Sequence, residues 1–202
     1  MDKNQHLVWI DCEMTGLNPE KDSLVEIAVV ITDAELNILD DGLDIVIKPL
    51  PGSLENMNDF VREMHTTSGL IHELAEGLDL ADAEQIVLDY VQRFVPEART
   101  APLAGNTIGT DRMFLNRYMP ALDQHLHYRN IDVSTLKELA RRWYPRIYFQ
   151  MPKKDGGHRA LADILESIEE LRYYRGTMMV EQPGPSSADA QRVAESLRAD
   201  RI

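Results

Sequence analysis

Residues 8–17, VWIDCEMTGL, begin as a buried β-strand and then place two carboxylates where the apolar run would be expected to continue. Side chains alternate between the two faces of a strand, so Asp11 and Glu13 project from the same face. Two negative charges this close repel each other unless a cation lies between them. The stretch therefore predicts a core strand that carries a cation site at its end.

The rest of the chain is typical of one domain with a tail. It has 202 residues, of which 44% are hydrophobic and 27% are charged, enough for a single core. The one cysteine, Cys12, excludes an intramolecular disulfide and favours a reducing compartment. The first apolar run begins too early to follow a signal peptide, and no apolar run is long enough to span a bilayer. We therefore expect a soluble, cytoplasmic protein.

The charge is negative overall but unevenly distributed. A net charge of −13 argues against a general affinity for long duplex nucleic acid, because such binding needs cations spread along the phosphates. Residues 128–159, in contrast, contain eight Lys or Arg and only three acidic residues. A small basic region on an acidic body suits a short anionic ligand better than a duplex.

Periodicity predicts an α/β fold. β-Strands are expected at residues 7–12, 23–33, 43–49, 101–106 and 128–134, and helices at 68–76, 81–95, 111–118, 135–143 and 159–174. The short connections between the first three strands favour an antiparallel meander. Prolines and a Gly-Gly pair predict a loop that can move at 145–157. This order of elements indicates a mixed five-stranded central sheet flanked by helices.

The composition changes after Gly176. The segment EQPGPSSADA is typical of a linker, and QRVAESLRADRI allows at most a short, weakly amphipathic helix. We therefore expect one folded domain over 1–176 and a separate tail over 177–202.

Two further motifs extend the carboxylate pattern. GNTIGTD places Asp111 at the start of a predicted helix, and GGHRALAD places Asp163 five residues after His158. Carboxylate oxygens gathered in one place favour hard cations such as Mg²⁺ or Mn²⁺ over zinc. The helical periodicity nevertheless puts Asp163 on the polar side of its helix, so periodicity alone would predict a solvated side chain.

Together, the three motifs resemble those of the DEDD exonuclease superfamily, in its histidine-containing DEDDh subgroup. The segments WIDCEMTGL, GNTIGTDRMFLNRYMP, HYRNIDVSTLKELARRW and ADILESIEELRYYR look like the oligoribonuclease family over about residues 6–176. The resemblance implies a ribonuclease H-like fold and a homodimer. It also implies 3′-to-5′ hydrolysis of very short RNA, dinucleotides above all, to nucleoside 5′-monophosphates.

The same resemblance assigns the catalytic roles. Two divalent cations, Mg²⁺ or Mn²⁺, would be held by Asp11, Glu13, Asp111 and Asp163, with Asp11 bridging both. His158 would act as the general base. An imidazole with its ordinary pKa of about 6.5 suits that role at neutral pH.

Substrate contacts are implied by the resemblance at eight positions: Leu17, Phe60, His65, Thr107, Tyr128, Arg129, Ser134 and Thr135. Leu17 would separate two bases. Phe60 would stack on a base where the family usually has tryptophan, and His65 would also face the nucleotide.

The remaining five positions would recognise the 5′ phosphate end of the substrate. Arg129 offers a planar donor fork for phosphate, Thr107, Ser134 and Thr135 offer hydroxyls, and Tyr128 would reach in from the partner subunit. A plain helix cap is an equally good interpretation of Ser134.

Two other functions remain open at this stage. A DNA-proofreading exonuclease of the same superfamily would share the catalytic motifs, but would not be expected to carry HYRNIDVST. A catalytically inactive nucleic-acid-binding module would have no need to keep four mutually repelling acids.

Overall fold

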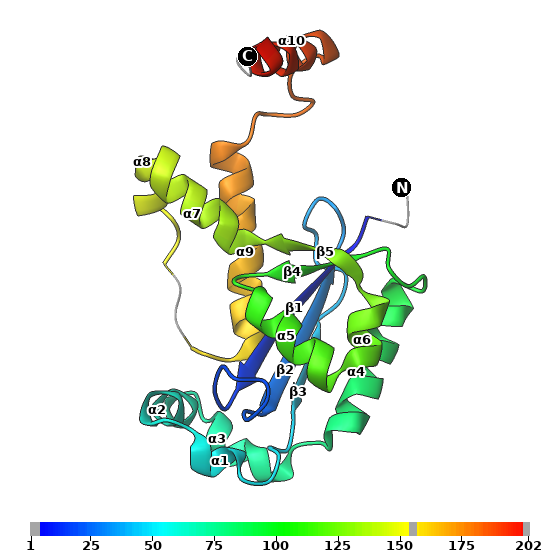
Figure 1. Ribbon diagram of the computed structural model, residues 1–202, viewed down its shortest axis with the longest axis vertical. Helices are drawn as coiled ribbons and strands as arrows, with labels where there is room; N and C mark the ends of the chain where they lie inside the picture. Colours follow the sequence, from blue (N-terminus) through cyan, green and yellow to red (C-terminus); the bar gives the residue numbers. More distant parts are fainter. Residues whose placement is uncertain (1–4, 154–156, 200–202) are drawn as a thin grey trace.

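The computed structural model describes residues 5–153 and 157–199, within which five strands form one central sheet (Figure 1). The strands are β1 Leu7–Met14, β2 Leu24–Thr32, β3 Leu43–Val46, β4 Pro102–Gly105 and β5 His127–Asp132. Their order across the sheet is β3-β2-β1-β4-β5. β1 pairs antiparallel with β2 and parallel with β4, so the prediction of a mixed sheet is confirmed.

β1 lies at the centre of the sheet because it is apolar on both faces. Val8, Ile10 and Cys12 contribute to the core on one face, and Trp9 contributes to the core on the other. A continuous apolar run is typical of a strand that is covered on both sides. The central strand is therefore rigid up to the point where its carboxylates begin.

Helices cover both faces of the sheet. α4 Leu80–Phe94, α5 Gly109–Tyr118 and α6 Pro120–His125 share the core that contains Val8 and Ile10. α7 Val133–Trp143 and α9 Ala160–Met178 share the core that contains Trp9. The short helices α1 Ser53–Asn56, α2 Asp59–Thr67 and α3 Leu70–Glu73, followed by η1 Leu74–Glu76, gather near the C-terminal end of β1 (Figure 1).

Several segments are more helical than the sequence predicted, among them α2 and α8. α2 forms where no helix was expected, and the Asn58 side chain caps it by accepting a hydrogen bond from the Val61 amide (2.9 Å). α8 Pro145–Phe149 lies inside the predicted loop, where Pro145 occupies the first helical position, the one that proline favours. Residues 154–156 of that segment lie outside the described residues.

The inward face of α9 also differs from the predicted apolar stripe. Leu165, expected in the core, is 42% exposed, whereas Ser167 and Glu170 are buried. The reason is a polar contact, because Asn106 Nδ2 donates to both Ser167 Oγ (2.9 Å) and Glu170 Oε2 (3.1 Å). Buried polar groups that are paired in this way do not need an apolar neighbour.

The C-terminal segment contains a longer helix than expected. α9 ends at Met178, just past the predicted boundary at Gly176, and α10 spans Ser187–Ala199. α10 lies beyond the end of α9 and away from the sheet (Figure 1). Among the described residues, no helix is both long enough and apolar enough to cross a membrane.

Candidate active site

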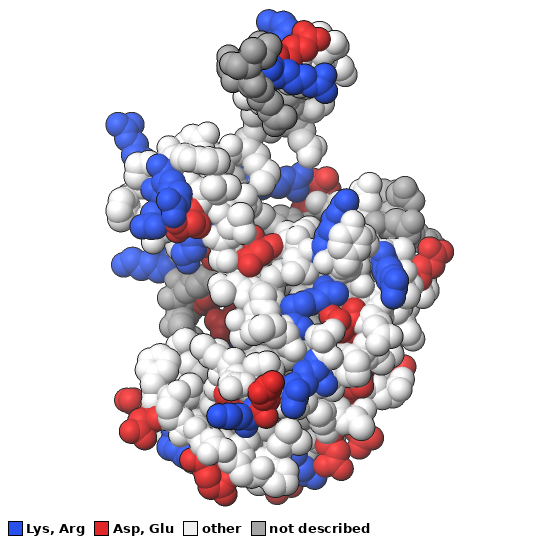
Figure 2. Space-filling view, viewed as in Figure 1, with Lys and Arg blue, Asp and Glu red and all other residues white. Residues whose placement is uncertain are grey.

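The predicted carboxylates meet at one cavity of about 420 Å³. Asp11 and Glu13 come from β1, Asp111 from the first turn of α5, and Asp163 from the first turn of α9. In an α/β sheet, ligands bind beyond the carboxyl ends of the strands, where chain connections diverge. In Figure 2, a hollow with acidic atoms at its base opens between α2 and the α7–α8 region. The four acids predicted as metal ligands therefore share one site.

The backbone of β1 orients the first three acids. Cys12 is buried in the core on the opposite face, which leaves Asp11 and Glu13 together on the cavity side. The Cys12 amide donates a hydrogen bond to Asp111 Oδ1 (3.0 Å), so the carboxylate from α5 is tied directly to the strand. This contact joins residues that are far apart in the sequence.

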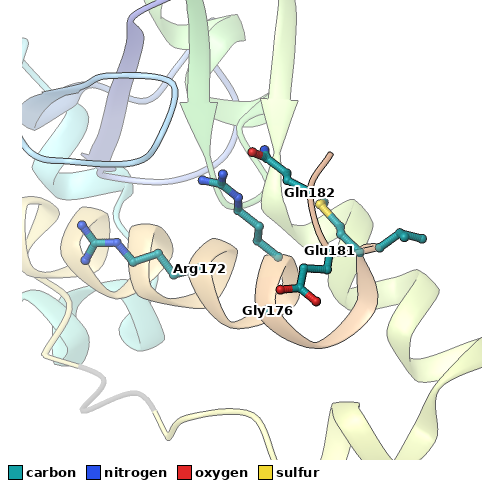
Figure 3. Close-up of a pocket in the computed structure, with 7 residues that line it drawn as sticks. Arg172, Gly176, Glu181 and Gln182 are labelled. Atoms are coloured by element: carbon teal, nitrogen blue, oxygen red, sulfur yellow. The ribbon is translucent and has the colours of Figure 1, made fainter. Parts of the chain in front are cut away.

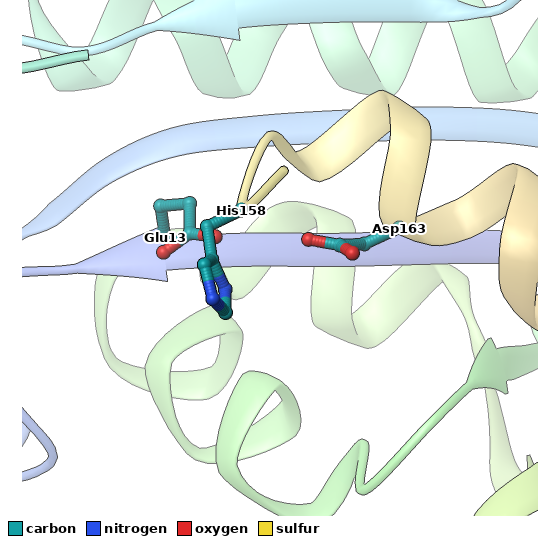
Figure 4. A group of neighbouring side chains, drawn as sticks. All are labelled: Glu13, His158 and Asp163. Carbon is teal, nitrogen blue, oxygen red and sulfur yellow. The ribbon is translucent and has the colours of Figure 1, made fainter. Parts of the chain in front are cut away.

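Glu13, His158 and Asp163 form a compact group with ligand character. One ligand atom from each residue lies within 4.8 Å of the others. Figure 4 shows His158 beside Glu13 and the Asp163 carboxylate pointing toward them from α9. Asp163 is half-buried and lines the cavity. Helical periodicity alone, which favours a solvated side chain, is therefore wrong about its position.

Burial and mutual repulsion oppose ionisation of these acids. Burial, together with the charges of Asp111 and Glu13, raises the pKa of Asp11 well above its ordinary value. The pKa of Glu13 rises to about 8, mainly by burial and then by repulsion from Glu26, and burial raises the pKa of Asp111 to about 7. Converging oxygen ligands whose charges are unfavourable alone fit a divalent cation.

We expect the metal-free protein to lose stability as the pH rises. The unfolded chain releases the protons of Glu13 and Asp111 near 4.5 and 3.8, whereas the folded protein holds them up to about 8 and 7. Folding therefore takes up protons in this window, and the free energy of unfolding falls as pH increases through it. Thermal unfolding in EDTA should show a lower Tm at about pH 8 than at about pH 5.5. A Tm in EDTA that rises over this range would contradict the raised pKa values.

Two of the predicted base contacts line the cavity. Leu17 and Phe60 each have 76% of their surface exposed, and both border the same cavity as the carboxylates. Leu17 follows the turn after β1, and Phe60 lies in the first turn of α2. Large apolar side chains held open to solvent at a cavity are suited to contact a flat ligand.

The predicted nucleotide contact His65 is fully buried, unlike Leu17 and Phe60. Its Nε2 donates to the Met14 carbonyl oxygen (2.8 Å), and its Nδ1 lies 3.9 Å from Glu13 Oε2. Burial lowers the pKa of His65, and the hydrogen bond to Met14 only partly opposes this effect. His65 is buried because α2 packs against the end of β1. The sequence pattern did not indicate α2, so it could not indicate this burial.

Thr107 and Ser134 are brought together by Asp132, a residue outside the predicted site. The Thr107 amide donates to Asp132 Oδ1 (3.0 Å) and to Ser134 Oγ (3.3 Å). Asp132 also accepts from the Ser134 amide (3.0 Å) and is therefore the cap of α7, so the interpretation of Ser134 as the cap is wrong. An aspartate between a strand and a helix was the signal, since Asp is a favoured N-cap residue.

The other three phosphate-end positions lie away from the carboxylates in this single chain. Tyr128 and Arg129 are exposed on β5, an edge strand, with the guanidinium 5.4 Å from the centre of the Tyr128 ring. Thr135 borders a separate cavity of about 700 Å³ that also includes Leu7 and Leu36. Figure 2 shows Lys and Arg side chains gathered over α7 and α8.

Another cavity, of about 620 Å³, lies at the C-terminal end of α9 (Figure 3). Arg172, Gly176, Glu181 and Gln182 border it, and Glu181 is the one acidic side chain among the described residues of its lining. It lacks the converging carboxylates of the first cavity. The chemistry of the molecule therefore points to the cavity at the end of β1.

The fold and site agree with comparisons to known proteins. A family model described as Exonuclease, RNase_T, matches residues 8–171. An exonuclease I structure with bound product has a TM-score of 0.62 at 16% identity, over 85% of this chain and 43% of that one. Exonuclease I from Methylocaldum szegediense has a TM-score of 0.59 at 18% identity, over 86% of this chain and 41% of that one. The chain spans less than half of these structures, which share its fold, and its class is that of the ribonuclease H-like exonucleases.

Curated relatives give a closer assignment. The oligoribonuclease of Leifsonia xyli is 66% identical over 96% of this chain and 94% of its own length. Those of Streptomyces avermitilis and Cutibacterium acnes are 60% and 58% identical, over 95% and 93% of this chain and 96% and 93% of their own lengths. The chain belongs to the oligoribonuclease family.

Proposed function

We propose that the protein is a metal-dependent 3′-to-5′ exoribonuclease that degrades very short RNA, dinucleotides above all, to nucleoside 5′-monophosphates. The observation that carries this proposal is the convergence of four carboxylates at one cavity bordered by Leu17 and Phe60, with His158 beside Glu13 and Asp163. At about 420 Å³ the cavity falls within the range of small-ligand sites, which supports a short substrate. A catalytically inactive binding module would not account for this set of side chains.

The donor set suits two divalent cations, Mg²⁺ or Mn²⁺, held by Asp11, Glu13, Asp111 and Asp163. When bound, such cations polarise a phosphodiester and lower the pKa of water. His158 removes a proton from the attacking water as its oxygen bonds to phosphorus. The bond from phosphorus to the 3′ oxygen of the preceding nucleotide breaks, and that oxygen takes up a proton as it leaves.

The remaining residues hold the substrate in this proposal. Leu17 separates the two bases and Phe60 stacks on one of them. Thr107 and Ser134 lie at the N-terminal end of α7, where helix amides favour a phosphate. In a homodimer, Tyr128 reaches the partner's site, with Arg129 and Thr135 at the phosphate end.

The proposal also covers the bounds of the exonuclease domain and the cellular compartment of the protein. Residues 1–176 form the exonuclease domain, with 177–202 as a separate tail, and the protein acts in the cytoplasm.

A length series tests the substrate assignment. We expect 5′-phosphorylated RNA of two nucleotides to be cleaved fastest, with kcat/KM falling as length increases to about seven nucleotides, because a cavity of about 420 Å³ holds only a short substrate. Product release can be followed by chromatography with Mn²⁺ present. A primer-length DNA serves as the comparison, and faster cleavage of that DNA would favour the proofreading type of exonuclease instead.

A further inference from the structure

Arg159, the residue that follows His158, connects the start of α9 with two distant parts of the chain. Its Nε donates to Glu26 Oε1 (2.7 Å), and its two terminal nitrogens donate to Glu73 Oε1 (2.8 Å) and Oε2 (3.1 Å). Glu26 belongs to β2 and Glu73 to α3. One planar guanidinium therefore fixes the start of α9 to a strand and to a second helix, with the paired geometry that arginine forms with carboxylates.

Glu26 uses both of its oxygens to hold this junction. Its side chain is fully buried, and Oε2 accepts a hydrogen bond from the Ala160 amide at the first position of α9 (3.1 Å). A carboxylate is favourable at a helix N-terminus. Glu26 is also the cross-strand partner of Glu13, and such partners project from the same face of the sheet. The anchor of α9 and one metal ligand thus stand side by side on the same rigid pair of strands.

The backbone at His158 needs an anchor of this kind. His158 has a φ of +47°, a left-handed conformation that residues with a Cβ adopt rarely. The preceding Gly157 has open space around it and restrains the chain little. The side chain of His158 is exposed, so packing does not fix its direction. The restraint on its orientation comes from the following residue, Arg159.

We propose that Arg159, held by Glu26 and Glu73, is a positioning residue that directs His158 toward the carboxylates. This inference rests on the proposed exonuclease function. Loss of the guanidinium frees the junction between the loop and α9, so His158 spends less time in the orientation that accepts the proton. The metal ligands and base contacts remain in place, so turnover falls and substrate binding does not.

The first test compares kcat and KM for a 5′-phosphorylated diribonucleotide. In Arg159→Ala we expect kcat to fall about 10²-fold, the cost of misplacing a catalytic group by about 1 Å, with KM nearly unchanged. Arg159→Lys should be intermediate, because lysine keeps the charge but loses the planar fork. Arg175→Ala is the matched control. Arg175 lies in the same helix and pairs with Glu35, far from the carboxylates, so its removal should leave kcat unchanged.

A double-mutant cycle separates positioning from a general structural role. If Arg159 acts through His158, then Arg159→Ala should cost little more once His158→Ala has removed the base. An equal fall in kcat in both backgrounds would overturn the inference, as would an unchanged kcat in the single variant.

Glu73→Gln gives the same test if Arg159→Ala does not fold, because Glu73 is partly exposed and contributes from outside the core. A fall in kcat of several-fold is expected only when His158 is present, and an unchanged kcat with His158 present would overturn the inference. Wild-type protein that does not cleave the dinucleotide at all would refute the proposed function itself, before any variant is compared.

Discussion

Removal of divalent cations with EDTA is expected to abolish cleavage of a 5′-phosphorylated diribonucleotide, and Mg²⁺ or Mn²⁺ should restore it. The acids of the site repel one another, and burial raises the pKa values of Asp11, Glu13 and Asp111. Without a cation, these carboxyl groups tend to stay protonated, and no cation is present to polarise the phosphodiester. Release of nucleoside monophosphate, followed by chromatography before and after metal is added back, measures the effect.

Thermal unfolding supplies the control for this experiment. At about pH 6 the metal-free protein should still unfold cooperatively, since the raised pKa values keep part of the site neutral. Loss of activity in EDTA then reflects the chemistry and not loss of the fold. Activity that persists in EDTA at full rate would exclude the metal-dependent mechanism.

Local sequence pattern predicted the placement of three acids at the end of β1. The alternation of a buried strand is enough to place Asp11 and Glu13 on one face, and a predicted strand followed by a helix start is enough to indicate Asp111. These inferences succeed because each depends on neighbours only a few residues away.

The residues that the sequence placed less well depend on distant contacts. Periodicity placed Asp163 in solvent because it cannot show that the first turn of α9 approaches β1. The burial of His65 follows from α2, whose N-terminal cap at Asn58 stands in a segment without clear apolar periodicity. Glu170 is inside the fold because Asn106 reaches it across the interior. In each case tertiary contact overrides the local pattern.

The anchoring role of Arg159 likewise depends on distant contacts that local sequence pattern does not show. Its partner Glu26 lies inside the most apolar strand of the chain, where a carboxylate would be expected to be unfavourable. Burial does raise the pKa of Glu26, while the hydrogen bonds from Ala160 and Arg159 lower it. A buried acid in a core strand therefore signals a distant partner, but the sequence does not show which residue that partner is.

Asp111→Asn should change activity and metal-free stability in opposite directions. Loss of one carboxylate ligand is expected to reduce kcat by on the order of 10³-fold, equivalent to several kcal/mol of lost transition-state stabilisation. The asparagine keeps an oxygen that can accept the hydrogen bond from the Cys12 amide, so the tie to β1 survives. The variant therefore removes charge while preserving the shape of the site.

The gain in stability follows from the buried charge. Burial raises the pKa of Asp111 to about 7, so at about pH 8 the metal-free wild type must fold around an ionised, desolvated carboxylate. Replacing it by a neutral amide should raise the free energy of unfolding in EDTA by about 2 kcal/mol, or a Tm increase of roughly 4–8 °C for a chain of this size. The gain should be smaller at about pH 5.5, where the folded protein already holds the proton. With Mn²⁺ present the order should reverse, because cation binding stabilises the wild type and much less the variant. A variant that is less stable than wild type in EDTA at pH 8 would show that Asp111 serves packing and not cation binding.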